Sequence, residues 1–98
     1  MYIVRDIFQL KFGHYRDVKA LLDEAMNSGM FSRDRKPRAL SDFTGDAYRL
    51  VLEQGFDSLA DFEKTLTDDF KKEEWQKWYV RFKHHIESSN REIMKQVM

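Results

Sequence analysis

Asp6 is an acidic residue at a position where the sequence pattern predicts an apolar one. It interrupts one side of an alternating segment, residues 2–12, where the same side otherwise carries Tyr2, Val4, Phe8 and further apolar residues. Desolvation raises the pKa of a carboxyl group that faces apolar side chains, and such a group can act as a general base. The alternative is a salt bridge across the sheet to a basic residue such as Arg49. Both readings follow from the sequence.

Histidines are the second source of acid–base chemistry, because their charge changes near neutral pH. We expect His14 to be exposed at the start of a helix. In a later helix, His84 falls opposite the aromatic side and His85 lies on its flank, about 80° from Trp75. We therefore predict His85 as the second acid–base residue, the alternative being a surface histidine. Since His84 and His85 are adjacent, they cannot chelate one metal ion, and the sequence supports no metal site.

Aromatic residues recur at helical spacing near the end of the chain: Trp75, Trp78, Tyr79 and Phe82. Such stripes form a core more often than they bind a ligand. If a pocket exists, we predict that Tyr48, Trp75 and Tyr79 line it.

The composition excludes several classes of function. Lysine plus arginine and aspartate plus glutamate each number 17, so the net charge is zero, and the basic excess typical of nucleic-acid binding is missing. The basic cluster Arg33, Arg35, Lys36 and Arg38 is interpreted as a solvated loop, with an anion site as the alternative. There is no cysteine, and no phosphate-binding loop, nucleophile elbow or H-E-x-x-H motif. We predict no cofactor.

The hydrophobic period predicts six segments in a fixed order. Strands are expected at 2–12, 38–43, 47–54 and 89–98, and a helix at 14–29. A split helical region is expected from 58 to 86, where Ser58 and Asp61 form a capping box and residues 67–69 interrupt the helix. The order β-α-β-β-α-β is that of the ferredoxin-like α+β fold, with an antiparallel sheet and one layer of helices.

One domain is expected over residues 1–98, because the chain is too short for two cores. The second sheet face also carries apolar residues, which predicts a homodimer through the sheet faces. No apolar run approaches the length of a membrane span, and charged residues interrupt the N-terminal segment. We expect a cytoplasmic protein that binds neither membranes nor nucleic acid.

Three stretches resemble one family. Arg5-x-Ile7-Phe8-x-Leu10-Lys11-x-Gly13 resembles the opening of NIPSNAP-like members of the dimeric α/β-barrel superfamily, to which antibiotic-biosynthesis-monooxygenase-like proteins belong. Thr44-Gly45 followed by a strand and Phe56-Asp57-Ser58-Leu59-Ala60-Asp61-Phe62-Glu63 resembles their middle, and Glu74-Trp75-x-x-Trp78 resembles the start of their acidic, tryptophan-containing helix. Phe12 stands where these proteins often have proline.

The resemblance implies a dimeric α/β barrel with a central cavity. It does not imply one activity, since the superfamily includes cofactor-independent monooxygenases, haem-degrading enzymes, isomerases and proteins without a known reaction. The haem-degrading members use an asparagine of the first strand with a tryptophan and a histidine. Trp75 and His85 could imitate two of these, but Asp6 or Gln9 would replace the asparagine.

The leading hypothesis is a barrel that binds a small apolar or aromatic molecule, with cofactor-independent oxygenation or proton transfer through Asp6 and His85. The competing hypothesis is a non-catalytic carrier or assembly module, and haem binding is the remote one. The sequence leaves open whether the protein is an enzyme.

Overall fold

The computed structural model describes residues 1–31, 37–44, 47–70 and 72–98, with the side chains of Asp69 and Phe70 excepted. Four expectations therefore lie outside the described residues. The first is the basic cluster at Arg33, Arg35 and Lys36, and the second is a hairpin turn at Gly45 and Asp46, which the short break between the strands at 38–43 and 47–54 predicts. The other two are the side chain of Phe70, predicted to continue the apolar stripe of the helix from residue 58, and the start of the following helix, predicted near Lys71.

Four strands and three helices make up the described chain. In order they are β1 (Tyr2–Leu10), α1 (Tyr15–Asn27), β2 (Arg38–Ser41), β3 (Arg49–Phe56), α2 (Leu59–Phe70), α3 (Glu73–Lys83) and β4 (Ile86–Lys95). The strands form one sheet in the order β2-β3-β1-β4, and every neighbouring pair is antiparallel. The predicted ferredoxin-like α+β fold, with a second helical region in two parts, is confirmed. The interruption was predicted at residues 67–69, however, and α2 continues through them and ends at Phe70.

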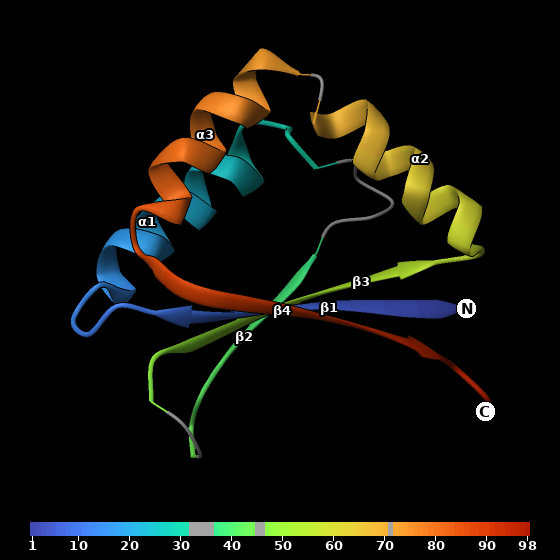
Figure 1. Ribbon diagram of the computed structural model, residues 1–98, viewed down its shortest axis with the longest axis horizontal. Helices are drawn as coiled ribbons and strands as arrows, with labels where there is room; N and C mark the ends of the chain where they lie inside the picture. The colour runs from blue at the N-terminus through green and yellow to red at the C-terminus, as the bar shows by residue number, and fades with distance from the viewer. Residues whose placement is uncertain (32–36, 45–46, 71) are drawn as a thin grey trace.

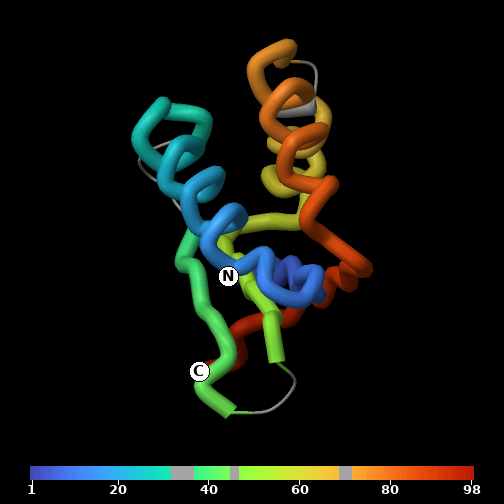
Figure 2. The backbone as a smooth tube through the Cα atoms, turned by 90° about the vertical axis from the view of Figure 1, so that its left-hand side faces the viewer, coloured from blue at the N-terminus to red at the C-terminus, as the bar shows by residue number. Residues whose placement is uncertain are grey.

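All three helices lie on the same side of the sheet, as Figure 1 shows. The view turned by 90° in Figure 2 separates α1 from α2 and α3, which stand above different parts of the sheet. We call the covered side the inner face. Because side chains alternate along a strand, the even-numbered residues of β1 point to it, and Val4 and Leu10 are almost fully buried there.

The core lies between the inner face and the helices α1 and α3. It contains Leu10 and Leu50 from the sheet, the α1 residues Val18, Leu21, Leu22 and Ala25, and Trp78 and Phe82 from α3. The four α1 residues recur at helical spacing, which is why this segment, predicted over 14–29, forms an amphipathic helix. Gly13 has a φ of 81°, a backbone conformation that glycine adopts easily, and it lies in the turn between β1 and α1.

The outer face of the sheet carries a short apolar row. Ile7 of β1 is paired with Val51 of β3, which in turn is paired with Leu40 of β2, so the three side chains lie next to one another. Figure 1 shows no helix on this side. Arg5 and Arg38 flank the row, and both form ion pairs with Glu53.

Two element ends differ from the expectation and change the position of a candidate residue. Helix α3 ends at Lys83 and β4 begins at Ile86, three residues before the predicted strand start. The reason is the pairing of Leu10 with Ile86, which extends the β1–β4 ladder after an irregularity at Gln9 and Leu10. His85 therefore follows the helix instead of lying on its flank. The N-cap role of Ser58 in the predicted capping box is confirmed, because the Asp61 backbone N–H donates to Ser58 Oγ at 3.1 Å.

None of the described helices has the length and apolar character that crossing a membrane requires.

Candidate ligand-binding cavity

A cavity of about 350 Å³ opens between the inner face of the sheet and the helices α2 and α3. This volume falls within the range of small-molecule pockets in proteins. The residues around it come from every strand except β2, from both helices and from the segments before β2. They are Asp6, Phe8, Phe31, Pro37, Leu52, Gln54, Phe62, Thr65, Leu66, Trp75, Trp78, Tyr79, Phe82, Ser89, Asn90 and Arg91.

Aromatic rings form one wall of the cavity. Along α3, Trp75 stacks on Trp78 with centroids 5.3 Å apart, and Trp78 stacks on Phe82 at 4.8 Å. Phe8 of β1 meets Phe82 edge-on at 4.9 Å, which joins the helix to the sheet. The Trp78 indole N–H donates to the Leu21 carbonyl of α1 at 2.8 Å. This bond fixes the middle of the stack, where Trp78 and Phe82 are buried in the core, and the half-buried Trp75 is the ring of the stack that a ligand can reach most easily.

Asp6 and Arg91 form the charged part of the cavity. The Arg91 Nε donates to Asp6 Oδ1 at 2.6 Å, and the Arg91 guanidinium lies 5.3 Å from the centre of the Phe62 ring. The two residues are direct partners in the β1–β4 ladder, so the sheet register places them together. The sequence offered Arg49 as a partner of Asp6, but Arg49 is paired with Gln9 and binds Asp42 at 3.0 Å. Its register position is on the opposite face.

The structure brings together three of the five candidate residues named from the sequence. Asp6, Trp75 and Tyr79 line the cavity. Tyr48 lies elsewhere, in a shallow hollow with Tyr15 and Phe43, and its ring packs against Phe12 at 5.0 Å. Its φ of 63° shows that it belongs to the turn before β3, whereas the sequence placed it within the strand.

His85 lies in a third place and does not reach Asp6. It lines an open hollow with Asp17, Leu21 and Arg81, and this hollow shares no residue with the cavity. Burial lowers the pKa of His85, an effect that the Asp17 carboxylate opposes and that the nearby His14, His84 and Lys11 reinforce. An acid–base pair of Asp6 and His85 acting on one small substrate therefore has no geometric basis.

Arg91 and the inner-face residues around it were missed by the sequence reasoning. A last strand was predicted from residue 89, and an alternating strand places Arg91 on the same face as Ser89. The sequence signal for this pair was an acidic residue in one predicted strand, Asp6, and a basic residue in another, Arg91. The register that makes them partners is a tertiary feature, so it could not be read from either segment alone.

Comparison with known proteins links this architecture to solved structures. No protein-family model matches the sequence, and no curated protein matches it either. Among solved structures, an uncharacterised NIPSNAP domain protein from Burkholderia xenovorans superposes with a TM-score of 0.88 over 99% of this chain and 95% of its own, at 11% identity. A NIPSNAP family protein of unknown function from Agrobacterium tumefaciens has a TM-score of 0.89 at 18% identity, covering 98% of this chain and 87% of its own.

A more distant neighbour is a candidate antibiotic biosynthesis monooxygenase from Nitrosomonas europaea. It has a TM-score of 0.74 and 13% identity, and the match covers 100% of both chains. The resemblance expected from Arg5–Gly13 and the two later stretches is thus confirmed as a likeness of fold. This chain has the ferredoxin-like α+β fold that NIPSNAP domain proteins share with antibiotic-biosynthesis-monooxygenase-like proteins.

Proposed function

We propose that the cavity between the sheet and the helices α2 and α3 binds a small, largely aromatic molecule. The observation that carries this proposal is the stack of Trp75, Trp78 and Phe82, which lines a partly open cavity of about 350 Å³. Flat rings offer a large contact area to another ring and lose little side-chain entropy when they bind it.

Arg91 in the cavity lining supports a ligand that carries one anionic group. Arg91 contacts Asp6 through Nε, and a guanidinium has further N–H donors arranged in a fork that suits a carboxylate, sulfonate or phenolate. The neighbouring polar side chains, Ser89 and Gln54, add neutral partners. An aromatic acid of one or two rings has the required combination of apolar body and anionic end.

A proton-transfer reaction is the catalytic version of this proposal. The Asp6 carboxylate lines the cavity and its side chain is 23% exposed, so a bound molecule can reach it. A carboxylate within hydrogen-bond distance of a substrate can remove a proton, and the adjacent Arg91 would stabilise the anion that forms. Cofactor-independent oxygenation begins with such a step, because a substrate carbanion or phenolate can react with O₂.

The non-catalytic alternative also has one observation in its favour. Asp6 is paired with the Arg91 cation, which suits a carrier whose charged groups recognise a ligand without reacting with it. Haem binding has less support than either of these hypotheses. Trp75 lines the cavity, but His85 does not, and no histidine occurs among the described residues that line it. Of the two residues that could match the haem-degrading site, only Trp75 therefore lies in the cavity.

The binding proposal is tested with the anionic aromatic probe 8-anilinonaphthalene-1-sulfonate, titrated against the folded protein and followed by its fluorescence. Trp75→Leu removes part of the aromatic wall and is expected to weaken binding at least fivefold. Tyr15→Leu is the matched control, because Tyr15 is an aromatic residue of α1 that lies in a different hollow. Equal affinity of the two variants would overturn the assignment of the probe to this cavity.

A second copy of the chain is the proposed partner of the outer sheet face. The row Ile7, Val51 and Leu40 lies on a face that no helix of the described chain covers. Packing two such faces together buries both rows and gives the dimeric barrel that the sequence predicts. Beside the row, Arg5 and Arg38 both pair with Glu53 of the same copy, so the charges next to the contact are partly neutralised before two copies meet.

A further inference from the structure

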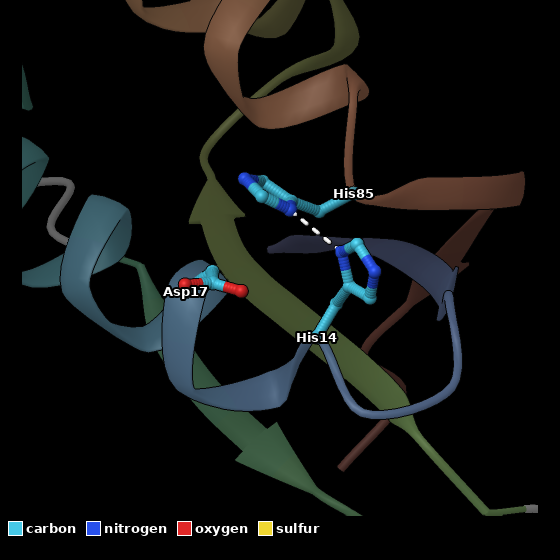
Figure 3. A group of neighbouring side chains, drawn as sticks. All are labelled: His14, Asp17 and His85. Carbon is cyan, nitrogen blue, oxygen red and sulfur yellow. Dashed lines mark hydrogen bonds between the residues drawn. The ribbon is translucent and has the colours of Figure 1, made fainter.

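His14, Asp17 and His85 form a cluster of metal-ligand side chains outside the cavity. Figure 3 shows the two imidazole rings facing each other, with the Asp17 carboxylate on the near turn of α1. One ligand atom of each residue lies within 4.8 Å of those of the other two, and the His14 and His85 Nδ1 atoms are 2.8 Å apart. In the sequence His14 and His85 are 71 positions apart, whereas the predicted lack of a metal site rested on the adjacent pair His84 and His85.

The backbone holds both histidines in place. The Lys11 N–H donates to the His85 carbonyl at 2.9 Å, and the Lys11 carbonyl accepts from the His14 N–H at 3.0 Å. One residue thus ties the turn after β1 to the turn after α3. These bonds do not involve the imidazole rings, so they hold the two backbone segments together and leave the ring nitrogens available to a ligand.

The side chain of His14 is not used in the ordinary way for its position, and those of Asp17 and His85 are accessible. His14 is the residue before α1, yet its side chain makes no capping hydrogen bond to the helix. Asp17 lies in the first turn of α1, where the helix dipole favours a negative charge, and its side chain is exposed. His85 is half-buried at the end of α3 and lines an open hollow with Asp17.

We propose that His14, Asp17 and His85 bind one divalent transition-metal ion such as Zn²⁺, through Nδ1 of both imidazoles and one carboxylate oxygen. Two imidazoles and a carboxylate are a ligand set that Zn²⁺ and its neighbours in the first transition row prefer. At a Zn–N distance of about 2.0–2.1 Å, two nitrogens on a tetrahedral ion are about 3.3 Å apart. The rings need to separate by about half an ångström from the observed 2.8 Å to accept the ion.

The site lies beside a space that can hold the remaining ligand of the ion. The hollow next to His85 and Asp17 is open to solvent and is also lined by Glu24 and Arg81, which pair with each other at 3.0 Å. An ion with three protein ligands keeps one position for water. Lys11 is the nearby cation that opposes metal binding, and Asp17 supplies the negative charge that offsets it.

The competing explanation is a hydrogen bond between two neutral imidazoles, in which one Nδ1–H donates to the other Nδ1. Both explanations keep the rings together in the free protein. They differ when metal is added, because the hydrogen bond must break for both Nδ1 atoms to coordinate. The Zn²⁺ ion should then raise the melting temperature, since it binds the folded chain and joins residues that are separated by more than two-thirds of the sequence.

The experiment uses untagged full-length protein freed of metal, titrated with Zn²⁺ in competition with a chromophoric chelator. His14→Gln and His85→Gln are each expected to weaken Zn²⁺ binding at least tenfold, and Asp17→Asn is expected to weaken it by a smaller factor. The matched control is His84→Gln, which removes a neighbouring histidine that is not part of the cluster and should leave the affinity within a factor of two. Equal affinity of wild type and His14→Gln, or an equal loss in His84→Gln, would overturn the site.

A second measurement needs no variant and covers the case in which a substitution prevents folding. The chain has three histidines, so their ring nitrogens can be resolved individually by long-range ¹H–¹⁵N correlation in the wild-type protein. On addition of Zn²⁺ the Nδ1 signals of His14 and His85 should shift together at equal stoichiometry while those of His84 stay in place. Unchanged His14 and His85 signals at saturating Zn²⁺ would show that the pair is a hydrogen bond only.

Discussion

Asp6 and Arg91 meet as direct partners on adjacent strands, and their side chains line an aromatic cavity and form an ion pair of 2.6 Å. The pair gives the cavity both an anion and a cation at one point. A ligand that contacts Arg91 would be bound as an aromatic acid. A substrate that contacts Asp6 could instead lose a proton to its carboxylate. Single substitutions that keep the shape of each side chain can separate these roles.

Asp6→Asn is expected to tighten binding of 8-anilinonaphthalene-1-sulfonate by about two- to tenfold, and Arg91→Gln to weaken it by a similar factor. In wild type the Asp6 carboxylate competes with the sulfonate for the guanidinium, and the amide does not carry that charge. Fluorescence titration at constant ionic strength measures the affinity of both variants for the probe. Weaker binding to Asp6→Asn would show that the probe does not use Arg91.

If the cavity carries out proton transfer, Asp6→Asn abolishes turnover of the substrate while the fold is kept. Circular dichroism and the melting temperature provide the control for folding. An Asn variant that binds the substrate and turns it over at the wild-type rate would remove Asp6 from the reaction and leave the carrier hypothesis.

Trp78→Phe should destabilise the protein by about 1–3 kcal/mol, because it removes the indole N–H that bonds the Leu21 carbonyl and part of a buried ring. Unfolding in urea, followed by circular dichroism, measures the change. Tyr79→Phe is the control on the same helix: Tyr79 is 42% exposed, so its free energy of unfolding should change by less than about 0.5 kcal/mol. Similar losses in both variants would contradict the role given to the Trp78 hydrogen bond.

Glu53 is expected to make stability depend on pH in the acid range. The hydrogen bond from Arg38, and secondarily the charges of Arg38 and Arg5, lower the pKa of Glu53 below its usual 4.5, against the opposing effect of burial. The folded state therefore binds a proton less readily than the unfolded state. The stabilisation is complete above the unfolded pKa and is lost as the pH falls through the folded pKa.

Glu53→Gln should accordingly lower the free energy of unfolding at pH 7 by less than about 1 kcal/mol, since much of this ion-pair network is open to solvent. The difference from wild type should shrink towards zero as the pH is lowered below 4. Urea unfolding at a series of pH values measures it. A difference that stays constant down to pH 3 would show that shape, and not charge, causes the effect.

Ile7→Lys should weaken self-association at the outer sheet face and shift the protein towards monomer, because it places a charge in the middle of the apolar row. Val80→Lys is the matched control, since Val80 is 58% exposed on α3, away from the outer face. Size-exclusion chromatography with light scattering, or native mass spectrometry, reports the mass. A wild-type monomer, or an Ile7→Lys variant that remains fully dimeric, would contradict the proposed interface.

The local pattern was enough to predict the order of the elements, and it failed where a tertiary contact decided the outcome. The alternation of residues 2–12 placed Val4, Asp6, Phe8 and Leu10 on one face, and the structure confirms that arrangement. Helical spacing placed Trp78 and Phe82 on the buried side of α3. Both patterns are local, since they depend only on the period of the backbone.

The partners of the candidate residues were not predictable in this way. Asp6 meets Arg91 across 85 positions and His14 meets His85 across 71, so both contacts depend on how β4 is aligned with β1. The end of α3 at Lys83 moved His85 off the helix, which an angle calculated for a longer helix could not show. The turn at Tyr48, with its positive φ, likewise took a predicted strand residue out of the sheet.

The central claim, that the cavity binds a small aromatic anion, is tested most directly at its two tryptophans. Trp75 and Trp78 are the only tryptophans of the sequence, and both line the cavity, so a ¹H–¹⁵N correlation spectrum reports on it through two indole signals. Titration with 8-anilinonaphthalene-1-sulfonate should shift both indole signals along one saturable curve. Saturable binding that leaves both indole signals unmoved would contradict the account and place the ligand elsewhere on the protein.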